Sequence, residues 1–546
     1  MTQYKDFWPP GAFLKYLTSG MNLPRMLPVE IIGELEIHTL DLSGLKLNVS
    51  YNTPFIVPSR FSAHKIISAG SLEELLPQLH DRVRAARTSF VVLVVGGKIV
   101  DEIEIVQAFG KKSVALISRL TIEAVMNAPD RDRALIALAE PLMRYLGRHT
   151  LSPYRPGKPA HAGRFFGRVE ALSQALSGGK MGGNFTIMGN RRIGKTSLLR
   201  EIKARLLKDN ARLKTADIYG NNFHSTHDVI KGMFEHLRPD LARRLDSEPQ
   251  LLDNLPAHIN QLPEKANEDV AVFIDELDHI LEFDAKQGFK LLNLLRATFE
   301  HERCRIFFAG FRRVMEAKNH QDTPLYNFTQ ALPLTSLTKI ETHEMIIGPF
   351  SLLGIEVSPG LPEAIMHETS GHPELVQMFC AKVVEYFGAH GKSPSPDALI
   401  SSIVEDNVFR QTVYAAFLKN TNPIEQLSCY GLIARAVNRR ESFDRFQFAL
   451  QDIDEVLRSH GISLSLRQLN LLADNLLIGG VVGLVAGRNS RVYRFAVPRL
   501  GDYCIADDLN YNIRKTKEEL DTAPGGVSIV MDPPEGFDNV TEPGTF

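Results

Sequence analysis

The sequence predicts an α/β protein whose centre is a mainly parallel β-sheet covered by helices. Short apolar segments alternate with helical patterns from residue 165 to about 340, at 185–188, 215–219, 270–274, 306–309 and, more weakly, near Ala331. Apolar strands separated by helices of this length are typical of a parallel sheet that is buried on both faces. We therefore expect one central α/β domain with further domains on either side of it.

Length and charge limit what else the chain can be. At 546 residues the chain is longer than one hydrophobic core normally holds, so about three domains are expected. The composition is 44% hydrophobic and 23% charged, as in ordinary globular proteins. Because 62 Lys and Arg stand against 64 Asp and Glu, no overall field attracts nucleic acid or anionic lipid. A nucleic-acid site would have to be local.

Cysteines and apolar runs indicate a cytoplasmic location. The cysteines lie far apart and have no CxxC spacing, which argues against a zinc site and against a disulfide framework; they are Cys304, Cys380, Cys429 and Cys504. The first residues lack the pattern of a signal peptide, and the apolar run 476–487 is shorter than the roughly 20 residues that span a bilayer. We expect a reducing compartment and no membrane contact.

The part before the central sheet divides into a domain and a linker. Residues 1–150 contain strand-like segments at 90–95 and 113–117 and a helical pattern at 131–146, which predict a small α/β domain of unknown role. Residues 151–164 are rich in Pro, Gly and basic side chains and lack periodicity. They predict an exposed linker, which limited proteolysis should cut first, apart from the tail after Lys517.

Three further regions follow the predicted core, residues 165–340. Residues 341–420 contain only helical patterns and predict a helical lid. In residues 421–510 the order is helix, helix, turn, helix and then two apolar runs around the turn 487–490, which predicts a winged helix-turn-helix. Residues 511–546 form an acidic tail, with no basic residue after Lys517, and are expected to be disordered.

A complete GxxxxGKT motif lies between a strand and a helix. It follows the apolar segment 185–188, precedes an amphipathic helix that begins near Ser197, and consists of Gly189, Asn190, Arg191, Arg192, Ile193, Gly194, Lys195 and Thr196. In this context the glycines turn backbone N–H groups toward phosphate oxygens, Lys195 reaches the terminal phosphates, and the Thr196 hydroxyl binds Mg²⁺. The sequence therefore predicts a site for ATP or ADP with Mg²⁺, formed by these eight residues together with Ser197.

Two carboxylates end the apolar strand 270–274. In an α/β sheet, ligands bind at the edge formed by the carboxyl ends of the strands, so Asp275 and Glu276 are expected near the phosphates. Asp275 is the second predicted Mg²⁺ residue, and Glu276 is the predicted base that takes a proton from the attacking water. Together with Lys195 they predict an ATPase.

At this point the sequence resembles a known class. The segment 165–172, FFGRVEAL, is similar to the FxGRxxEL segment that precedes the P-loop in AAA-type and STAND-type ATPases, and Gly371-His372-Pro373 is similar to the GxP lid motif of STAND ATPases. The resemblance covers about 165–500. It implies that Arg168 lies near the nucleotide and that Pro373 faces the adenine. The alternative for the second motif is an ordinary helix start, where proline is favoured.

An arginine pair follows the segment 306–309. Arg312 and Arg313 occupy the place where the class keeps a γ-phosphate sensor, and we take Arg312 as the candidate; the alternative is a solvated pair at a helix start. Arg191 and Arg192 either serve a neighbouring subunit or face solvent, so no arginine finger in trans is assigned.

The predicted winged helix offers polar residues that could touch DNA, on its recognition helix and its wing: Arg467, Gln468, Asn470, Arg488, Arg491 and Arg494. Acidic residues balance the basic ones in this region, so a packing or autoinhibitory module is favoured over a dedicated DNA binder. In the N-terminal domain Asp101, Glu102 and Glu104 lack a partner lysine and indicate a solvated loop. The histidines show no metal-ligand spacing.

These features favour one function over another. The preferred hypothesis is a STAND-type switch: ADP keeps the lid and winged helix closed on the core, ATP opens them for homo-oligomerisation, and the N-terminal domain meets a protein partner. The alternative is a DNA-associated AAA-type ATPase whose winged helix grips duplex DNA.

Overall fold

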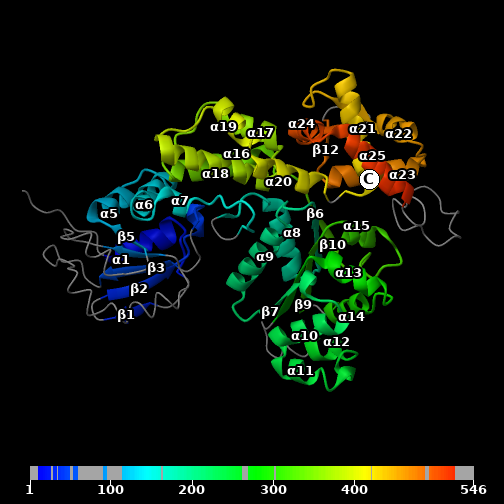
Figure 1. The fold of residues 1–546 in the computed structure, drawn as a ribbon. Coiled ribbons are helices and arrows are strands. Elements are labelled where there is room, and N and C mark those ends of the chain that lie inside the picture. The colour runs from blue at the N-terminus through cyan, green and yellow to red at the C-terminus, as the bar shows by residue number, and fades with distance from the viewer. Residues whose placement is uncertain are drawn as a thin grey trace, which may run out of the picture. The chain divides into compact units, whose positions relative to one another are not determined.

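A computed structural model describes the chain at residues 10–25, 29–32, 35–48, 53–58, 90–94, 113–160, 164–260, 269–300, 303–419, 421–485 and 491–522. It divides into two compact units. Unit 1 comprises residues 1–168, 337–366 and 374–404, and unit 2 comprises 169–336, 367–373 and 405–546. Each unit is described by itself, and Figure 1 labels its elements.

Unit 1 contains a five-stranded mixed sheet in the order β1-β2-β3-β4-β5. The first three strands are antiparallel, whereas β3, β4 and β5 are parallel. The strands are β1 (Glu30–Ile32), β2 (Leu35–Leu40), β3 (Thr53–Pro58), β4 (Phe90–Val94) and β5 (Ser113–Ile117). The strands predicted at 90–95 and 113–117 and the helix predicted at 131–146 are present in this unit.

The helices of unit 1 come from both ends of its sequence. The N-terminal ones are α1 (Pro10–Lys15), η1 (Tyr16–Gly20), η2 (Ser43–Leu45), α5 (Arg119–Met126), α6 (Arg131–Leu146) and α7 (Arg148–Leu151). The later ones are α16 (Lys339–Leu352), α17 (Leu361–Thr369, which ends in unit 2), α18 (Pro373–His390) and α19 (Pro396–Val404).

The segment predicted as an exposed linker is packed where it begins. Leu151, Ser152 and Tyr154 are buried, and the Tyr154 hydroxyl donates a hydrogen bond of 2.8 Å to the carbonyl of Met345 in α16. The Gly157 N–H donates to Glu374 in α18. The expectation of an exposed linker from 151 onward is therefore wrong, because these residues fasten the N-terminal helices to α16 and α18; positions 161–163 lie outside the described residues.

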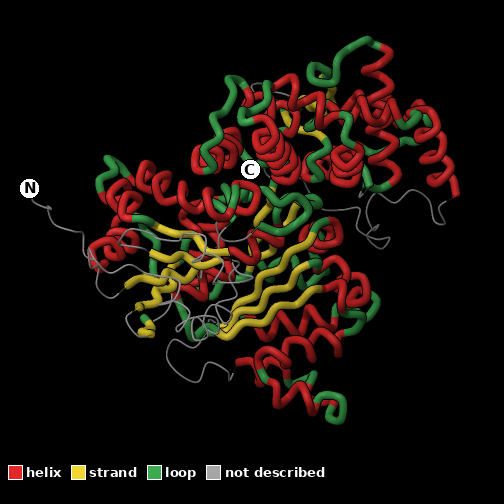
Figure 2. Tube along the Cα trace, turned by 60° about the vertical axis from the view of Figure 1, so that its left-hand side comes forward, coloured by secondary structure: helices red, strands yellow, loops and turns green. Residues whose placement is uncertain are grey.

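Unit 2 is built on a five-stranded sheet in the order β10-β6-β9-β8-β7, and all neighbouring strands are parallel. Figure 2 shows these strands in yellow with helices on both sides. The strands are β6 (Phe185–Gly189), β7 (Lys214–Tyr219), β8 (Val270–Asp275), β9 (Cys304–Gly310) and β10 (Gln330–Leu334). This confirms the predicted α/β fold with a parallel sheet.

Helices cover this sheet because its strands are apolar on both faces. Every residue of β8 and β9 is buried. Stacked aromatic rings join three strands on one face: Phe307 lies 5.8 Å from Phe185 and 5.1 Å from Phe273. A Cβ at Gly178 would lie 2.4 Å from the Phe185 ring, so only glycine lets α8 approach this row closely.

The remaining elements of the core connect these strands. They are α8 (Val169–Lys180), α9 (Lys195–Asp209), η4 (Gly220–Asn222), α10 (Thr226–Leu237), α11 (Pro239–Arg244), η5 (Pro249–Leu251), α12 (Leu255–Asn260), α13 (Leu277–Ala285), α14 (Lys290–Phe299) and α15 (Arg312–Asn319). Helical connections join successive parallel strands, as a parallel sheet requires. The connections from β7 to β8 and from β8 to β9 join neighbouring strands, whereas those from β6 to β7 and from β9 to β10 pass over other strands.

The C-terminal part of unit 2 is a small helical region with a three-stranded sheet. Its antiparallel sheet has the order β11-β13-β12. Its elements are α20 (Asn407–Phe417), α21 (Pro423–Asn438), β11 (Gln447–Ala449), α22 (Leu450–Ser459), α23 (Leu466–Ile478), β12 (Val482–Leu484), β13 (Val492–Phe495), α24 (Arg499–Ala506) and α25 (Leu509–Thr522). We call residues 421–522 the C-terminal module. Its element order is the one expected of a winged helix, with β11 as an added strand, and that assignment stays a prediction.

Two boundaries differ from expectation. Residues 511–522 belong to the helix α25, in which Thr516 and Leu520 are buried, so the predicted disordered tail does not begin at 511. The rest of that tail, 523–546, lies outside the described residues. The predicted lid 341–420 is also divided, since residues 367–373 and α20 belong to unit 2.

Candidate nucleotide site

The GxxxxGKT motif forms a loop between β6 and α9. Gly194 has φ 104° and Arg192 has φ 61°, so the chain reverses direction just before the helix begins at Lys195. The N-cap residue of α9 is Gly194, which has no side chain to cap the helix, and N–H groups at the start of a helix are the groups that bind anions. At Gly189 a Cβ would lie 2.6 Å from the Leu334 carbonyl oxygen. The loop has the form of a phosphate cradle.

Lys195 is held across this loop. Its Nζ donates hydrogen bonds of 2.9 Å to the carbonyl of Gly189 and 3.0 Å to that of Asn190. Burial lowers the pKa of Lys195, while the carboxylates of Glu276, Asp278 and Asp275 act in the opposite direction. The ammonium group therefore lies in a partly desolvated position, where its attraction to a phosphate is stronger than in water.

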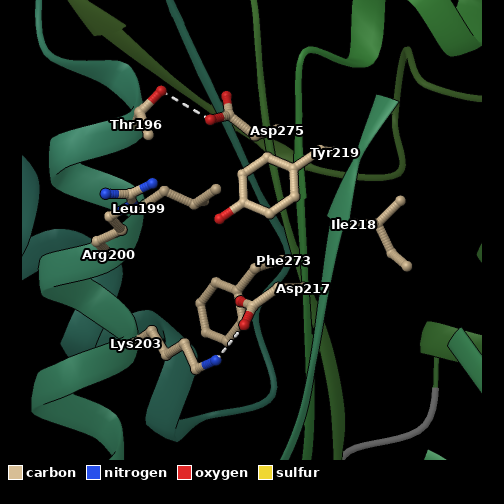
Figure 3. Close-up of a pocket in the computed structure, with 9 residues that line it drawn as sticks. All are labelled: Thr196, Leu199, Arg200, Lys203, Asp217, Ile218, Tyr219, Phe273 and Asp275. Atoms are coloured by element: carbon tan, nitrogen blue, oxygen red, sulfur yellow. Dashed lines mark hydrogen bonds and ion pairs between the residues drawn. The ribbon is translucent and has the colours of Figure 1, made fainter. Parts of the chain in front are cut away.

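Thr196 and Asp275 meet directly. The Thr196 hydroxyl donates a hydrogen bond of 2.7 Å to Oδ2 of Asp275, whose side chain is buried (Figure 3). These oxygens come from the start of α9 and the end of β8, and oxygen donors of this type suit Mg²⁺. A cavity of about 20 Å³ borders both residues, enough for a water molecule but not for a nucleotide. The residues fit a magnesium ion that keeps part of its water shell.

Glu276 follows Asp275 and points away from the core. Its side chain is exposed, and its backbone has φ 54°. The turn is tight: a Cβ at Gly220 would lie 2.3 Å from the Glu276 carbonyl oxygen. The backbone of Glu276 is therefore in the left-handed region that non-glycine residues seldom adopt, and its role as the base stays a prediction.

Asp278 is a site residue that the motifs do not identify. Its Oδ2 accepts a hydrogen bond of 2.7 Å from the Phe311 N–H, and its Oδ1 accepts one of 2.9 Å from the Arg313 N–H. One carboxylate in α13 therefore caps the start of α15 and fixes the backbone around Arg312. The sequence could have identified Asp278 only if the pairing of β8 with β9 had been known, because that pairing places the residues after β8 beside those after β9.

The arginine pair separates into two different environments. Arg312 donates to both carboxylate oxygens of Glu425 in α21, and its Cζ lies 5.3 Å from the centre of the Phe311 ring. Nζ of Lys195 lies 5.9 Å from the centre of the same ring. The Arg313 side chain is exposed and lies 3.4 Å from Glu282. Arg312 is thus the member of the pair on the P-loop side.

Other residues of the loop face the C-terminal part of unit 2. Nδ2 of the buried Asn190 donates to the carbonyls of Ala416, at 2.7 Å, and Gly479. Arg191 and Arg192 are both exposed, and Nη1 of Arg192 lies 3.5 Å from the Thr412 hydroxyl. Ile193 is buried beneath the loop.

Arg168 and Pro373 are the two residues that only the resemblance assigns to the nucleotide. Arg168 belongs to unit 1, where its N–H donates to Glu341 and burial lowers its pKa to about 10, so it remains charged at neutral pH. Gly371 has φ 71°, and Pro373 begins α18. His372, between them, packs edge-on against Phe417 at 5.2 Å. Their roles at the nucleotide stay predictions.

Several candidate DNA-contacting residues already have partners in the C-terminal module. Gln468 caps α23 together with Ser465, Asn470 donates to the Leu466 carbonyl, and Arg491 pairs with Asp474 at 2.8 Å. Arg467 and Arg494 are exposed. Arg488 lies outside the described residues, as do Asp101, Glu102 and Glu104 of unit 1.

The described ranges contain neither a cluster suited to a metal ion nor a helix suited to a membrane. Among those residues there is no cluster of three or more His, Cys, Asp or Glu that could hold a metal ion. Nor is any helix within them both long and apolar enough to cross a membrane. The four cysteines are all buried, with free thiols.

Comparison with known structures gives distant likenesses. An ORC2 protein of Aeropyrum pernix, solved with ADPNP and ADP, is 17% identical with a TM-score of 0.45, over 68% of this chain and 97% of that one. A Walker-type ATPase of Pyrococcus abyssi is 15% identical with a TM-score of 0.45, over 64% and 99%. At these values the likenesses say nothing about function. Comparison with curated proteins gives no match.

Comparison with protein families is more informative. The model of the family described as Novel STAND NTPase 1 matches residues 150–382. The match spans less than half of the chain, and it contains the whole parallel sheet, the P-loop, Asp275, Glu276 and Arg312. The geometry of the loop between β6 and α9 agrees with this match. Residues 150–382 are therefore similar to this family of STAND NTPases, and the loop between β6 and α9 has the geometry expected of its P-loop.

Proposed function

We propose that this protein binds and hydrolyses ATP with Mg²⁺ and uses the nucleotide as a molecular switch. The observation that supports this best is the convergence of Lys195, Thr196 and Asp275 at one edge of the sheet, with Glu276 exposed beside them. Lys195 is held by the loop carbonyls, and Thr196 and Asp275 form one oxygen cluster. A site that only binds the nucleotide and does not hydrolyse it would not need the exposed carboxylate of Glu276.

Each residue has a separate task in hydrolysis. A bound magnesium ion would neutralise charge on the terminal phosphates, and Thr196 and Asp275 would hold it. The Lys195 ammonium binds the same phosphates and offsets charge in the transition state. Glu276 accepts a hydrogen bond from the attacking water and takes its proton.

The switch follows if the two nucleotides favour different conformations. ADP keeps the lid and the C-terminal module closed on the core, and ATP favours an open state in which copies of the chain associate. The contacts of the Asn190 side chain with Ala416 and Gly479 support a closed resting state, since they tie the loop to the C-terminal part of unit 2. The N-terminal domain then meets a protein partner.

The test of this function separates binding from chemistry. Lys195→Ala removes a charge that contacts phosphate in the ground state and the transition state, so both nucleotide affinity and turnover should fall. Glu276→Gln keeps the size of the side chain but accepts no proton, so ATP should bind with parental affinity while phosphate release slows about 100-fold or more. Affinity is measured by fluorescence titration and turnover by phosphate release.

Mass measurements then test the switch. Light scattering should show larger particles with ATP than with ADP, and Glu276→Gln should remain assembled because it retains ATP. Parental hydrolysis by Glu276→Gln would remove the assignment of the base. If the variant traps ATP but remains monomeric, the ATPase stands and the switch does not.

The second hypothesis is an ATPase that acts on DNA through the C-terminal module. The intramolecular partners of Gln468, Asn470 and Arg491 count against it, because those side chains would first have to leave them. Salt-dependent binding of duplex DNA by the full chain, weakened by Arg467→Ala, would favour this alternative.

A further inference from the structure

The ion pair between Arg312 and Glu425 joins the nucleotide site to the C-terminal module. Both terminal nitrogens of Arg312 donate to the carboxylate, Nη1 at 2.8 Å, and Glu425 is completely buried. Glu425 lies in the first turn of α21, where it also accepts a hydrogen bond from the N–H of Asn422. A two-pronged pair of this kind fixes the plane of the guanidinium group and not only its charge.

The geometry leaves part of Arg312 unsatisfied. Its Nε–H is buried and, among the described residues, has no hydrogen-bond partner. A buried donor without an acceptor is costly, so this orientation suits the two terminal nitrogens but not the whole group. An anion with more acceptor oxygens than a carboxylate could satisfy all three nitrogens.

Such an anion would bind close by. Both cations lie near the same aromatic ring: Nζ of Lys195 is 5.9 Å and Cζ of Arg312 is 5.3 Å from the centre of the Phe311 ring. The backbone around Arg312 is fixed by Asp278, whose charge also acts on Lys195. Arg312 therefore lies close to Lys195 and the predicted phosphate position. Its terminal N–H groups nevertheless donate to Glu425.

We propose that Glu425 is an internal anion that occupies Arg312 in the resting state, and that the terminal phosphate of a nucleoside triphosphate displaces it. This inference rests on the proposed function and names how its site is regulated. Glu425 acts through Arg312, so it is a positioning residue. A diphosphate lacks the terminal phosphate and leaves the pair closed.

Displacement has a structural consequence. Once Arg312 turns to phosphate, Glu425 would be a buried carboxylate without its counter-ion, which is strongly unfavourable. The unfavourable state is relieved when α21 moves away and water reaches Glu425. Binding of a terminal phosphate and release of α21 are thereby coupled, and the coupling acts in both directions.

The test measures how strongly the site prefers a triphosphate. Dissociation constants for ADP and for the non-hydrolysable analogue AMPPNP are compared in the parent, Glu425→Gln and the double variant Arg312→Gln/Glu425→Gln. Glu425→Gln frees Arg312 but keeps an acceptor for Asn422, so its affinity for AMPPNP relative to ADP should rise about tenfold, as expected for one charge-assisted hydrogen bond. The double variant should lose this gain.

A matched control breaks another ion pair in the same part of unit 2. Asp507→Asn removes the partner of Arg410 by the same chemical change and should leave the ratio of the two affinities unchanged. As a measurement without substitution, hydrogen exchange in the parent should rise across Pro423–Asn438 with AMPPNP and not with ADP.

Each result decides the proposal. An unchanged affinity ratio in Glu425→Gln, or equal exchange of α21 with both nucleotides, would overturn the displacement while leaving the ATPase in place. If neither nucleotide binds the parent, the proposed function fails, and this inference fails with it. If Glu425→Gln does not fold, the exchange measurement on the parent still decides.

Discussion

Asp278 provides a prediction whose size follows from its contacts. Its two carboxylate oxygens accept hydrogen bonds of 2.7 and 2.9 Å from the N–H groups of Phe311 and Arg313, at the start of α15. Hydrogen bonds to charged groups contribute about 1.5–3 kcal/mol each, and helix caps about 0.5–2 kcal/mol. Because Asp278 is only half-buried and water can replace part of each bond, we take about 1 kcal/mol for each of the two bonds, and expect Asp278→Ala to reduce the free energy of unfolding by about 2 kcal/mol.

The conservative substitution should cost less. Asp278→Asn retains one acceptor oxygen of the two, so we expect a loss of about 1 kcal/mol. Urea unfolding measures both: with an m-value of about 2–3 kcal/mol/M, the alanine variant should unfold at a urea concentration lower by roughly 0.7–1 M. Asp240→Asn is the control, because its exposed ion pair with Arg238 should contribute less than about 1 kcal/mol.

The rate of ATP hydrolysis should fall in the same order as the stability of the two variants. When the start of α15 loosens, Arg312 is held less well, so phosphate release should fall more than affinity for ADP, and Asp278→Ala should be affected more than Asp278→Asn. Parental stability and parental turnover in Asp278→Ala would refute the reasoning. Equal losses in the two variants would show that the charge matters and not the number of acceptors.

Two further predictions concern unit 1. Tyr154→Phe removes the hydroxyl that donates to the Met345 carbonyl and should lower the free energy of unfolding by about 1 kcal/mol, whereas Tyr511→Phe, at an exposed position, should change nothing measurable in thermal unfolding. Burial lowers the pKa of His38 below its ordinary 6.5, so the unfolded state takes up this proton first as the pH falls. The stability of unit 1 should therefore be complete above about pH 6.5 and decline below it, with a smaller decline in His38→Gln; equal slopes in thermal unfolding would contradict this.

The sequence alone determined the parallel sheet, its P-loop and the edge at which its carboxylates lie. These features depend on local patterns: apolar strands, a glycine loop before a helix, and acidic residues directly after a strand. The strand predicted near Ala331 and the four before it all occur as β10, β6, β7, β8 and β9. The bond between Thr196 and Asp275 follows from the same logic, because the carboxyl ends of parallel strands meet at one edge.

Only the tertiary structure decided which distant residues touch this edge. The capping of α15 by Asp278 and the pairing of Arg312 with Glu425 join residues far apart in the chain, and no local pattern specifies such contacts. Packing also overrode local composition in two places. Leu151–Tyr154 contains a proline and is nevertheless buried against α16. The helix α25 is rich in charged residues and nevertheless buries the apolar side chain of Leu520. Composition describes what a segment prefers by itself, whereas burial depends on the partner that the fold provides.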